Sequence, residues 1–223
     1  MNTISPRRKI LLILVALLAA GVSPNLFVAA QAGHSTLHHL ALVILLPSLF
    51  VLAVVYGLAR LWGFTDVHHQ MSNGIIAGLV ATLGLELVRQ IGFHMGGMPG
   101  DMPKLLGVLL FNRFAQGPSL LSNIAGYAYH FWNGAAFGVI FSLIFGRGRV
   151  WLGTFFGVLI GIGFMVSPVA IALGVGYFGI DFGWGFAATV TLAHIAYGLL
   201  LGLVIHRLNT GAFSLLSRIT ELF

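Results

Sequence analysis

Residues 184–205 read WGFAATVTLAHIAYGLLLGLVI and contain no charged side chain. About 20 apolar residues in an α-helix, each adding about 1.5 Å, are enough to cross the hydrocarbon core of a bilayer. This stretch therefore predicts a membrane-spanning helix, and five further segments have the same character. The predicted spans cover residues 10–31, 39–61, 73–95, 121–145, 150–177 and 184–206.

The composition of the whole chain agrees with this interpretation. Of the 223 residues, 58 % are hydrophobic and only 7 % are charged, and the mean hydropathy is +1.00. A soluble domain has about a quarter of its residues charged. We therefore predict an all-α fold, a six-helix transmembrane bundle that forms one domain over residues 1–208, with the lipid bilayer as its surroundings.

Composition also excludes several functions. The sequence contains no cysteine, which removes disulfides, thiolate nucleophiles and cysteine-bound metal sites. The basic residues are too few and too scattered for a nucleic-acid surface, so no nucleic-acid partner is expected. Zinc-protease, nucleophile-elbow and phosphate-loop motifs are missing from the sequence, and we predict that the protein is not an enzyme.

The basic residues predict the orientation of the bundle. With a cytoplasmic N-terminus, Lys104 and Arg113 lie outside and eight other basic residues lie inside. Both termini are therefore predicted to be cytoplasmic, in a membrane that we expect to be the inner membrane of a bacterium. The eight predicted inside residues are Arg7, Arg8, Lys9, Arg60, Arg147, Arg149, Arg207 and Arg218.

Three segments near the spans need separate predictions. Residues 1–32 resemble a cleavable secretory signal, but their apolar run exceeds the usual signal core and favours an uncleaved anchor. Residues 103–113 are too short to span, and we expect an external half-helix there, capped by Asp101. The tail, residues 209–223, is amphipathic from residue 211, which predicts a helix lying on the cytoplasmic leaflet or docked on a partner subunit.

Glycines recur at a spacing of four along the last four spans. In lipid, small residues on one helical ridge let two backbones approach closely. We therefore expect spans three to six to form a tight bundle, with spans one and two at its periphery. The glycines concerned are Gly74, Gly78, Gly134, Gly138, Gly153, Gly157, Gly161, Gly198 and Gly202.

Two of these glycine stretches also share a histidine. Residues 130–138 (HFWNGAAFG) and 194–202 (HIAYGLLLG) have the same His-x-x-x-Gly-x-x-x-Gly spacing, which indicates a parallel repeat of a two-helix unit. With residues 102–107 (MPKLLG), they make residues 100–206 resemble an uncharacterised family of small multi-pass bacterial membrane proteins. The resemblance supports the helix count but implies no activity, substrate or cofactor.

Polar side chains gather within three of the predicted spans. Glu86 and Arg89 are three residues apart and can pair on one helix face. Such a pair can have a purely structural role, in which it fixes the register of the packed helices. A proton or solute relay through Glu86, His130 and His194 is the alternative. The predicted cluster comprises Glu86, Arg89, Gln90, His130, Asn133 and His194.

The same histidines suit a second chemistry. His130 and His194 could be the axial ligands of a b-type haem, with Arg89 at a propionate, although no cofactor is otherwise expected. Histidines and methionines in the external loops suit copper(I), but they lack a fixed ligand spacing and predict no metal site. These loop residues are His34, His38, His39, His94, Met95, Met98, Asp101 and Met102.

The leading functional prediction is a non-enzymatic accessory or scaffold subunit of a membrane complex, with other membrane subunits as its partners. One alternative is a small transporter or channel that uses Glu86, His130 and His194. Another is an electron-transfer subunit that binds haem b at His130 and His194.

Overall fold

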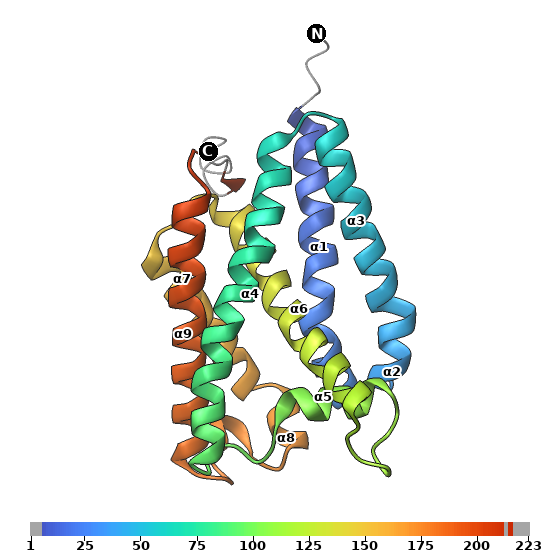
Figure 1. Ribbon diagram of the computed structural model, residues 1–223, viewed down its shortest axis with the longest axis vertical. Coiled ribbons are helices and arrows are strands. Elements are labelled where there is room, and N and C mark those ends of the chain that lie inside the picture. The colour runs from blue at the N-terminus through green and yellow to red at the C-terminus, as the bar shows by residue number, and fades with distance from the viewer. Residues whose placement is uncertain (1–5, 212–213, 216–223) are drawn as a thin grey trace.

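The computed structural model describes residues 6–211 and 214–215, and this part of the chain is helical without β-strands (Figure 1). The long helices run alternately down and up one axis of the molecule, so that consecutive helices are antiparallel. They are α1 (Pro6–Gln31), α3 (Leu46–Leu61), α4 (Thr65–His94), α6 (Leu120–Phe145), α7 (Val150–Met165) and α9 (Trp184–Leu208).

Short helices connect the long ones at the lower end of Figure 1. Serine and threonine hydroxyls begin several helices by accepting a hydrogen bond from a free backbone N–H, as Ser119 does for α6 from Ser122 over 3.2 Å. The short elements are α2 (Leu37–Leu40), the π-helical turn η1 (Ala41–Leu45), α5 (Met102–Leu110), α8 (Pro168–Ala172) and the 3-10 turn η2 (Tyr177–Gly179).

Five helical segments of the described chain are long and apolar enough to cross a membrane. The chain therefore has the helices of a multi-pass membrane protein, and four of the five segments contain or nearly match a predicted span. The third segment is longer than the predicted span, because it begins at Thr65, eight residues before the predicted start at residue 73. The five segments are Arg7–Gln31, Leu37–Leu61, Thr65–His94, Leu120–Phe145 and Trp184–Leu208.

The predicted span over residues 150–177 is wrong as one continuous helix. Helix α7 ends at Met165 after 16 residues, which gives a length of about 24 Å against a hydrocarbon core of about 30 Å. Ser167 has an extended backbone, and its hydroxyl accepts from Val169 N over 3.2 Å to begin α8. Pro168 disfavours a helical conformation at the preceding residue, which explains the break.

The short helix α5 occupies most of the predicted half-helix at 103–113, but Asp101 does not cap it. The Asp101 side chain makes no capping hydrogen bond and instead contacts Arg89 and Lys104. The amphipathic helix predicted for residues 211–223 lies almost wholly outside the described residues.

Basic side chains gather at one end of the molecule. Helices α1, α4 and α7 begin there and α3, α6 and α9 end there, whereas α5 lies at the opposite end with Lys104 (Figure 1). An ion pair between Lys9 and Asp66 joins the beginnings of α1 and α4 at the basic end. The described basic residues at this end are Arg7, Arg8, Lys9, Arg60, Arg147, Arg149 and Arg207.

Glycines bring α4 and α6 into backbone contact. A Cβ atom added to Gly74 would lie 2.7 Å from the carbonyl oxygen of Gly138, closer than real Cβ atoms approach. Gly78 faces Gly134 in the same way one turn further along. Only glycine at these positions allows the two helices to pack this closely.

Helices α7 and α9 form a second glycine-packed pair. A Cβ atom on Gly153 would lie 2.5 Å from the carbonyl oxygen of Gly198, and Gly157 faces His194 and Gly198. In each pair a descending helix packs on an ascending helix, and short helical segments at the lower end connect the two. The His-x-x-x-Gly-x-x-x-Gly stretches of residues 130–138 and 194–202 occupy equivalent places in the two pairs.

The closest backbone packing between the two pairs is that of α4 on α9. Helices α6 and α7 lie further apart and meet through aromatic side chains, with Phe137 and Phe141 of α6 against Phe156 of α7. Helix α1 packs on α6 and touches α8, so it belongs to the core and not to the periphery as predicted. Helix α3 is peripheral and packs on α1 and α4. The arrangement leaves a space bounded by α1, α4, α6, α7 and α9.

Candidate functional site

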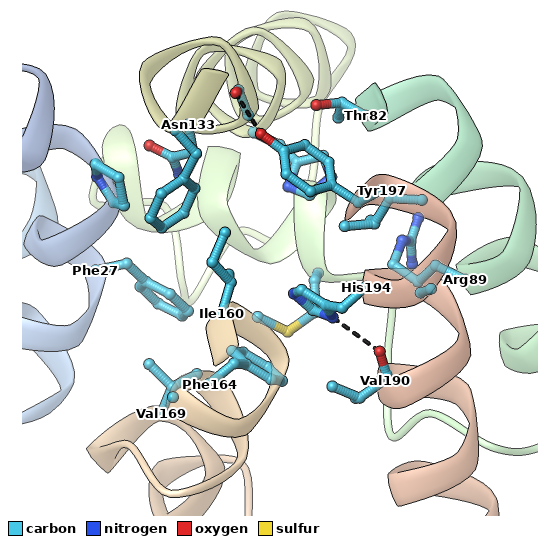
Figure 2. Close-up of a pocket in the computed structure, with 18 of the residues that line it drawn as sticks. Phe27, Thr82, Arg89, Asn133, Ile160, Phe164, Val169, Val190, His194 and Tyr197 are labelled. Carbon is cyan, nitrogen blue, oxygen red and sulfur yellow. Dashed lines mark hydrogen bonds between the residues drawn. The ribbon is translucent and has the colours of Figure 1, made fainter. Parts of the chain in front are cut away.

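A cavity of about 500 Å³ occupies the space between the two glycine-packed pairs. Its volume lies in the range of small-molecule sites, which is about 300–1,000 Å³. Figure 2 shows side chains from α1, α4, α6, α7 and α9 converging on it. Most of the wall is apolar, and its phenylalanines are Phe27, Phe137, Phe156 and Phe164.

The cavity follows from the distribution of glycine along the sequence. On the sides where α4 meets α6 and α7 meets α9, glycines bring the backbones together and leave no room for a ligand. Gly163 of α7 is not part of the contact with α9 and lines the cavity. A Cβ atom added to it would meet no atom within 4 Å. The helices therefore pack closely within each pair and leave open space between the two pairs.

A buried ion pair lies at the wall of the cavity. Arg89 donates from Nε to Glu86 Oε1 over 2.7 Å and from Nη2 to Glu86 Oε2 over 2.8 Å. This bidentate geometry is the contact expected for an i,i+3 spacing on α4. The side chain of Arg89 is 5 % exposed and that of Glu86 is 11 % exposed, so both charges are held away from water.

The ion pair extends to the loop that precedes α5. Nη2 of Arg89 also lies 3.2 Å from Asp101 Oδ1, and Nζ of Lys104 lies 3.1 Å from Asp101 Oδ2. Two carboxylates and two cationic groups thus form one chain that is neutral overall. The sequence analysis assigned Asp101 to a helix cap because its approach to Arg89 depends on how the loop folds back over α4.

His130 joins this chain from α6. Its Nε2 lies 2.9 Å from Glu86 Oε1, although the two atoms are not aligned as a hydrogen bond. Gln90, which the sequence placed in the same cluster, donates to the hydroxyl of Tyr127 over 3.2 Å and so ties α4 to α6. Glu86, Arg89, Gln90 and His130 therefore form one connected group between α4 and α6.

His194 lies on the cavity wall from α9, apart from the ion pair. Its Nδ1 lies 2.8 Å from the carbonyl oxygen of Val190, and Figure 2 marks this bond. Its ring stacks at 6.4 Å between centroids on Phe164 of α7. His130 and His194 both line the cavity, so the structure brings the three members of the predicted relay to one site.

Asn133 belongs to a separate contact between α1 and α6. Ser23 donates to Asn133 Oδ1 over 2.5 Å, and Tyr129 donates to the carbonyl oxygen of Ser23 over 2.7 Å. The sequence analysis missed the part played by Ser23. The local sequence contains no signal for it, because the contact joins residues that are 110 positions apart.

Tyr197 is a further cavity residue, and it was not part of the predicted cluster. It lies one turn from His194 and donates its hydroxyl hydrogen to the carbonyl oxygen of Gly134 over 2.7 Å. Thr82, one turn before Glu86, donates to the carbonyl oxygen of Gly78 over 2.7 Å. Both hydroxyls therefore have their hydrogens engaged and present only oxygen lone pairs to the cavity.

The geometry bears on the haem alternative. Neutral histidine binds haem iron through a ring nitrogen with a free lone pair. His194 Nε2 meets this requirement, but His130 Nε2 is held 2.9 Å from Glu86 Oε1. Ligation by both histidines would require His130 to leave Glu86, and the haem alternative stays a prediction.

The loop residues that suit copper are dispersed. His38 Nδ1 lies 2.6 Å from the carbonyl oxygen of Leu110 and His94 Nδ1 lies 2.7 Å from that of Gln90. Met98 is buried at the cavity, whereas Met95 is 81 % exposed. Within residues 6–211 and 214–215, no three histidine, aspartate or glutamate residues lie close enough together to hold a metal ion.

A comparison with protein-family models found no match, and neither did comparisons with curated proteins and with solved structures. The resemblance of residues 100–206 to an uncharacterised family therefore stays a prediction. The function has to be argued from the cavity and its polar residues.

Proposed function

We propose that this chain is a non-enzymatic multi-pass membrane protein that binds a small, largely apolar molecule inside the bilayer. The observation that carries the proposal is the cavity of about 500 Å³ between the two glycine-packed helix pairs. An apolar pocket with a few convergent polar groups is the usual form of a small-molecule site. The arginine and histidine side chains in this wall are Arg89, His130 and His194.

The form of the cavity favours binding over conduction. Towards the basic end its lining stops at Thr82 of α4, Phe137 of α6, Phe156 of α7 and Tyr197 of α9. Beyond this level, towards the basic end of the molecule, Gly74 and Gly138 are in backbone contact and so are Gly153 and Gly198. A channel would need a polar route through these glycine contacts. A relay or channel would therefore require the helices to separate at these contacts, whereas a binding protein would not.

The proposal is tested by filling the cavity. The Gly163→Phe substitution places a ring in space where a Cβ atom meets no neighbour within 4 Å. Gly57→Phe is the matched control, because Gly57 on α3 is also free of neighbours within 4 Å but does not line the cavity. Native mass spectrometry of protein released from native membranes would then identify bound small molecules.

We expect a co-purifying lipid-soluble molecule in the wild type and in Gly57→Phe, and its loss in Gly163→Phe. If all three proteins carry the same molecules, the cavity is not the site and the proposal is wrong. The haem alternative is tested on the same samples, because bound haem would give a Soret band that is lost in His194→Ala.

The accessory-subunit role stays a prediction. It requires partners that co-purify with the full-length chain and are lost when residues 211–223 are removed. A protein that is monomeric after mild solubilisation and retains its ligand would favour the binding function over the accessory role.

A further inference from the structure

The cavity is closed on most of its sides. Towards the basic end, the rings of Phe137 on α6 and Phe156 on α7 meet edge to face at 6.0 Å between centroids. Helices α4 and α9 form a second side, and α5 and α8 lie at the end opposite the basic one. These sides separate the cavity from the surroundings of the protein. The buried lining residues on these four helices include Leu85, Met102, Leu106, Val169, Val190 and Ala193.

The remaining side of the cavity is open. Of the residues that line the cavity, the exposed ones are Asn25 of α1 and Leu159 and Gly163 of α7. Among the described residues, α1 packs on α6 and touches α8, but no close backbone packing joins it to α7. Figure 2 shows α1 and α7 as separate walls, with Phe27 on one and Ile160 on the other. A lateral opening, with Asn25 on one rim and Leu159 and Gly163 on the other, therefore lies between α1 and α7.

The lateral opening lies at the depth of the lipid chains. Helix α7 begins at Val150, next to Arg149 at the basic end, and basic residues of this kind lie at the level of the head groups. At about 1.5 Å per residue, Leu159 lies about 14 Å and Gly163 about 20 Å from that beginning, within a hydrocarbon core of about 30 Å. The opening therefore faces hydrocarbon, and the lipid chains are the nearest molecules to it.

The charges and the volume of the cavity also suit a hydrocarbon chain. The carboxylates of Glu86 and Asp101 are matched by the cationic groups of Arg89 and Lys104, so a charged ligand would add a buried charge without a partner. A methylene group fills about the volume of one water molecule in the liquid, about 30 Å³. A cavity of about 500 Å³ therefore holds a chain of about 16 carbon atoms.

We infer that one hydrocarbon chain of a bilayer lipid enters the cavity through the lateral opening between α1 and α7. The chain packs on the phenylalanines of the wall, such as Phe27 and Phe164, while the head group stays at the membrane surface. Asn25 at the rim donates from Nδ2 to the carbonyl oxygen of Gly21 over 2.8 Å, so its amide is bonded within its own helix. This inference rests on the proposed function and adds the class of the ligand and its way in.

A phosphatidylcholine that carries a diazirine at the end of one chain tests the inference. The full-length protein is irradiated in nanodiscs that contain this lipid, and fragment spectra of its peptides locate the labelled residues. We expect label on Val190 and Ala193, which line the cavity on α9 and are 3 % and 2 % exposed. Leu87 on α4 is 66 % exposed and serves as the reference, because lipid outside the protein reaches it but not the other two.

Variants at the rim test the way in. Leu159→Trp narrows the lateral opening, and Leu199→Trp is the matched control, because Leu199 on α9 is 47 % exposed but does not line the cavity. We expect labelling of the α9 wall, relative to Leu87, to fall about tenfold in Leu159→Trp and to stay unchanged in Leu199→Trp. Gly163→Phe is a second variant at the same rim and should give the same loss.

A small probe separates the inference from the proposed function. Adamantyl diazirine is apolar and is not attached to a lipid. If it labels Val190 and Ala193 but the lipid does not, the cavity takes a small molecule, so the proposed function stands and the lipid-chain inference is wrong. If neither probe labels these residues, the proposed function fails as well. Labelling by the lipid that is unchanged in both Leu159→Trp and Gly163→Phe overturns the lateral opening as the way in.

Discussion

The hydroxyl of Tyr197 on α9 donates to the carbonyl oxygen of Gly134 on α6 over 2.7 Å, and this bond joins the two glycine-packed pairs across the cavity. Tyr197 is only 2 % exposed. The Gly134 carbonyl lies within a helix and has a backbone partner, so the tyrosine bond is an additional one. The contact lies where the cavity ends and the close helix packing begins.

Removing this hydroxyl should weaken the joint between the pairs without opening a void. We expect Tyr197→Phe to lower the free energy of unfolding by about 0.5–1.5 kcal/mol, the net value of one hydrogen bond. Reversible unfolding of the detergent-solubilised protein would measure it. A loss much larger than this would mean that the hydroxyl has another role.

Glycine contacts within the pairs should tolerate substitution far less. Gly138→Leu forces a side chain into the backbone of α4 at Gly74 and Gly78, and we expect it to destabilise the protein by about 3 kcal/mol or to prevent folding. Gly21→Leu is the control, since a Cβ atom there meets nothing within 4 Å. Size-exclusion profiles and thermal midpoints of both variants would decide. Equal stability of the two variants would contradict the glycine-packed pair.

The buried ion pair predicts strong coupling between its members. Glu86→Leu leaves part of the Arg89 charge uncompensated and Arg89→Met does the same to Glu86, so each should cost about 3 kcal/mol or more. The double variant should cost much less than the sum, because it buries no unpaired charge. A double-mutant cycle of unfolding free energies measures the coupling. Additive losses would show that the pair does not act as a unit.

The arrangement of the helix ends predicts the accessibility of introduced cysteines. The natural sequence has no cysteine, so single substitutions give unambiguous labelling. Arg60→Cys lies at the basic end and Met95→Cys at the opposite end. In intact cells an impermeant maleimide should label Met95→Cys alone, because basic ends face the cytoplasm. Labelling of Arg60→Cys alone would reverse the orientation.

Local patterns in the sequence accounted for much of this fold. The apolar runs predicted six spans, and five of them match long apolar helices, because hydrophobic length is a property of contiguous residues. The pairing of Glu86 with Arg89 follows from their spacing on one helix. The break after Met165 could also have been predicted, since proline at 168 disfavours a helical conformation at Ser167. It was not predicted, because apolar residues continue on both sides of this step.

Composition and helical period depend only on neighbouring residues, so they were enough to predict long apolar helices with glycine ridges and a few ionisable residues within them. The close packing of α4 on α9, with α6 and α7 meeting through side chains such as Phe141 and Phe156, could be seen only in the folded structure. The tertiary structure also decided that Asp101 returns to Arg89 and that His194 and Arg89 share one cavity. Such placements depend on how segments far apart in the sequence pack on one another. A glycine ridge allows two helices to pack closely but does not specify which helix is the partner.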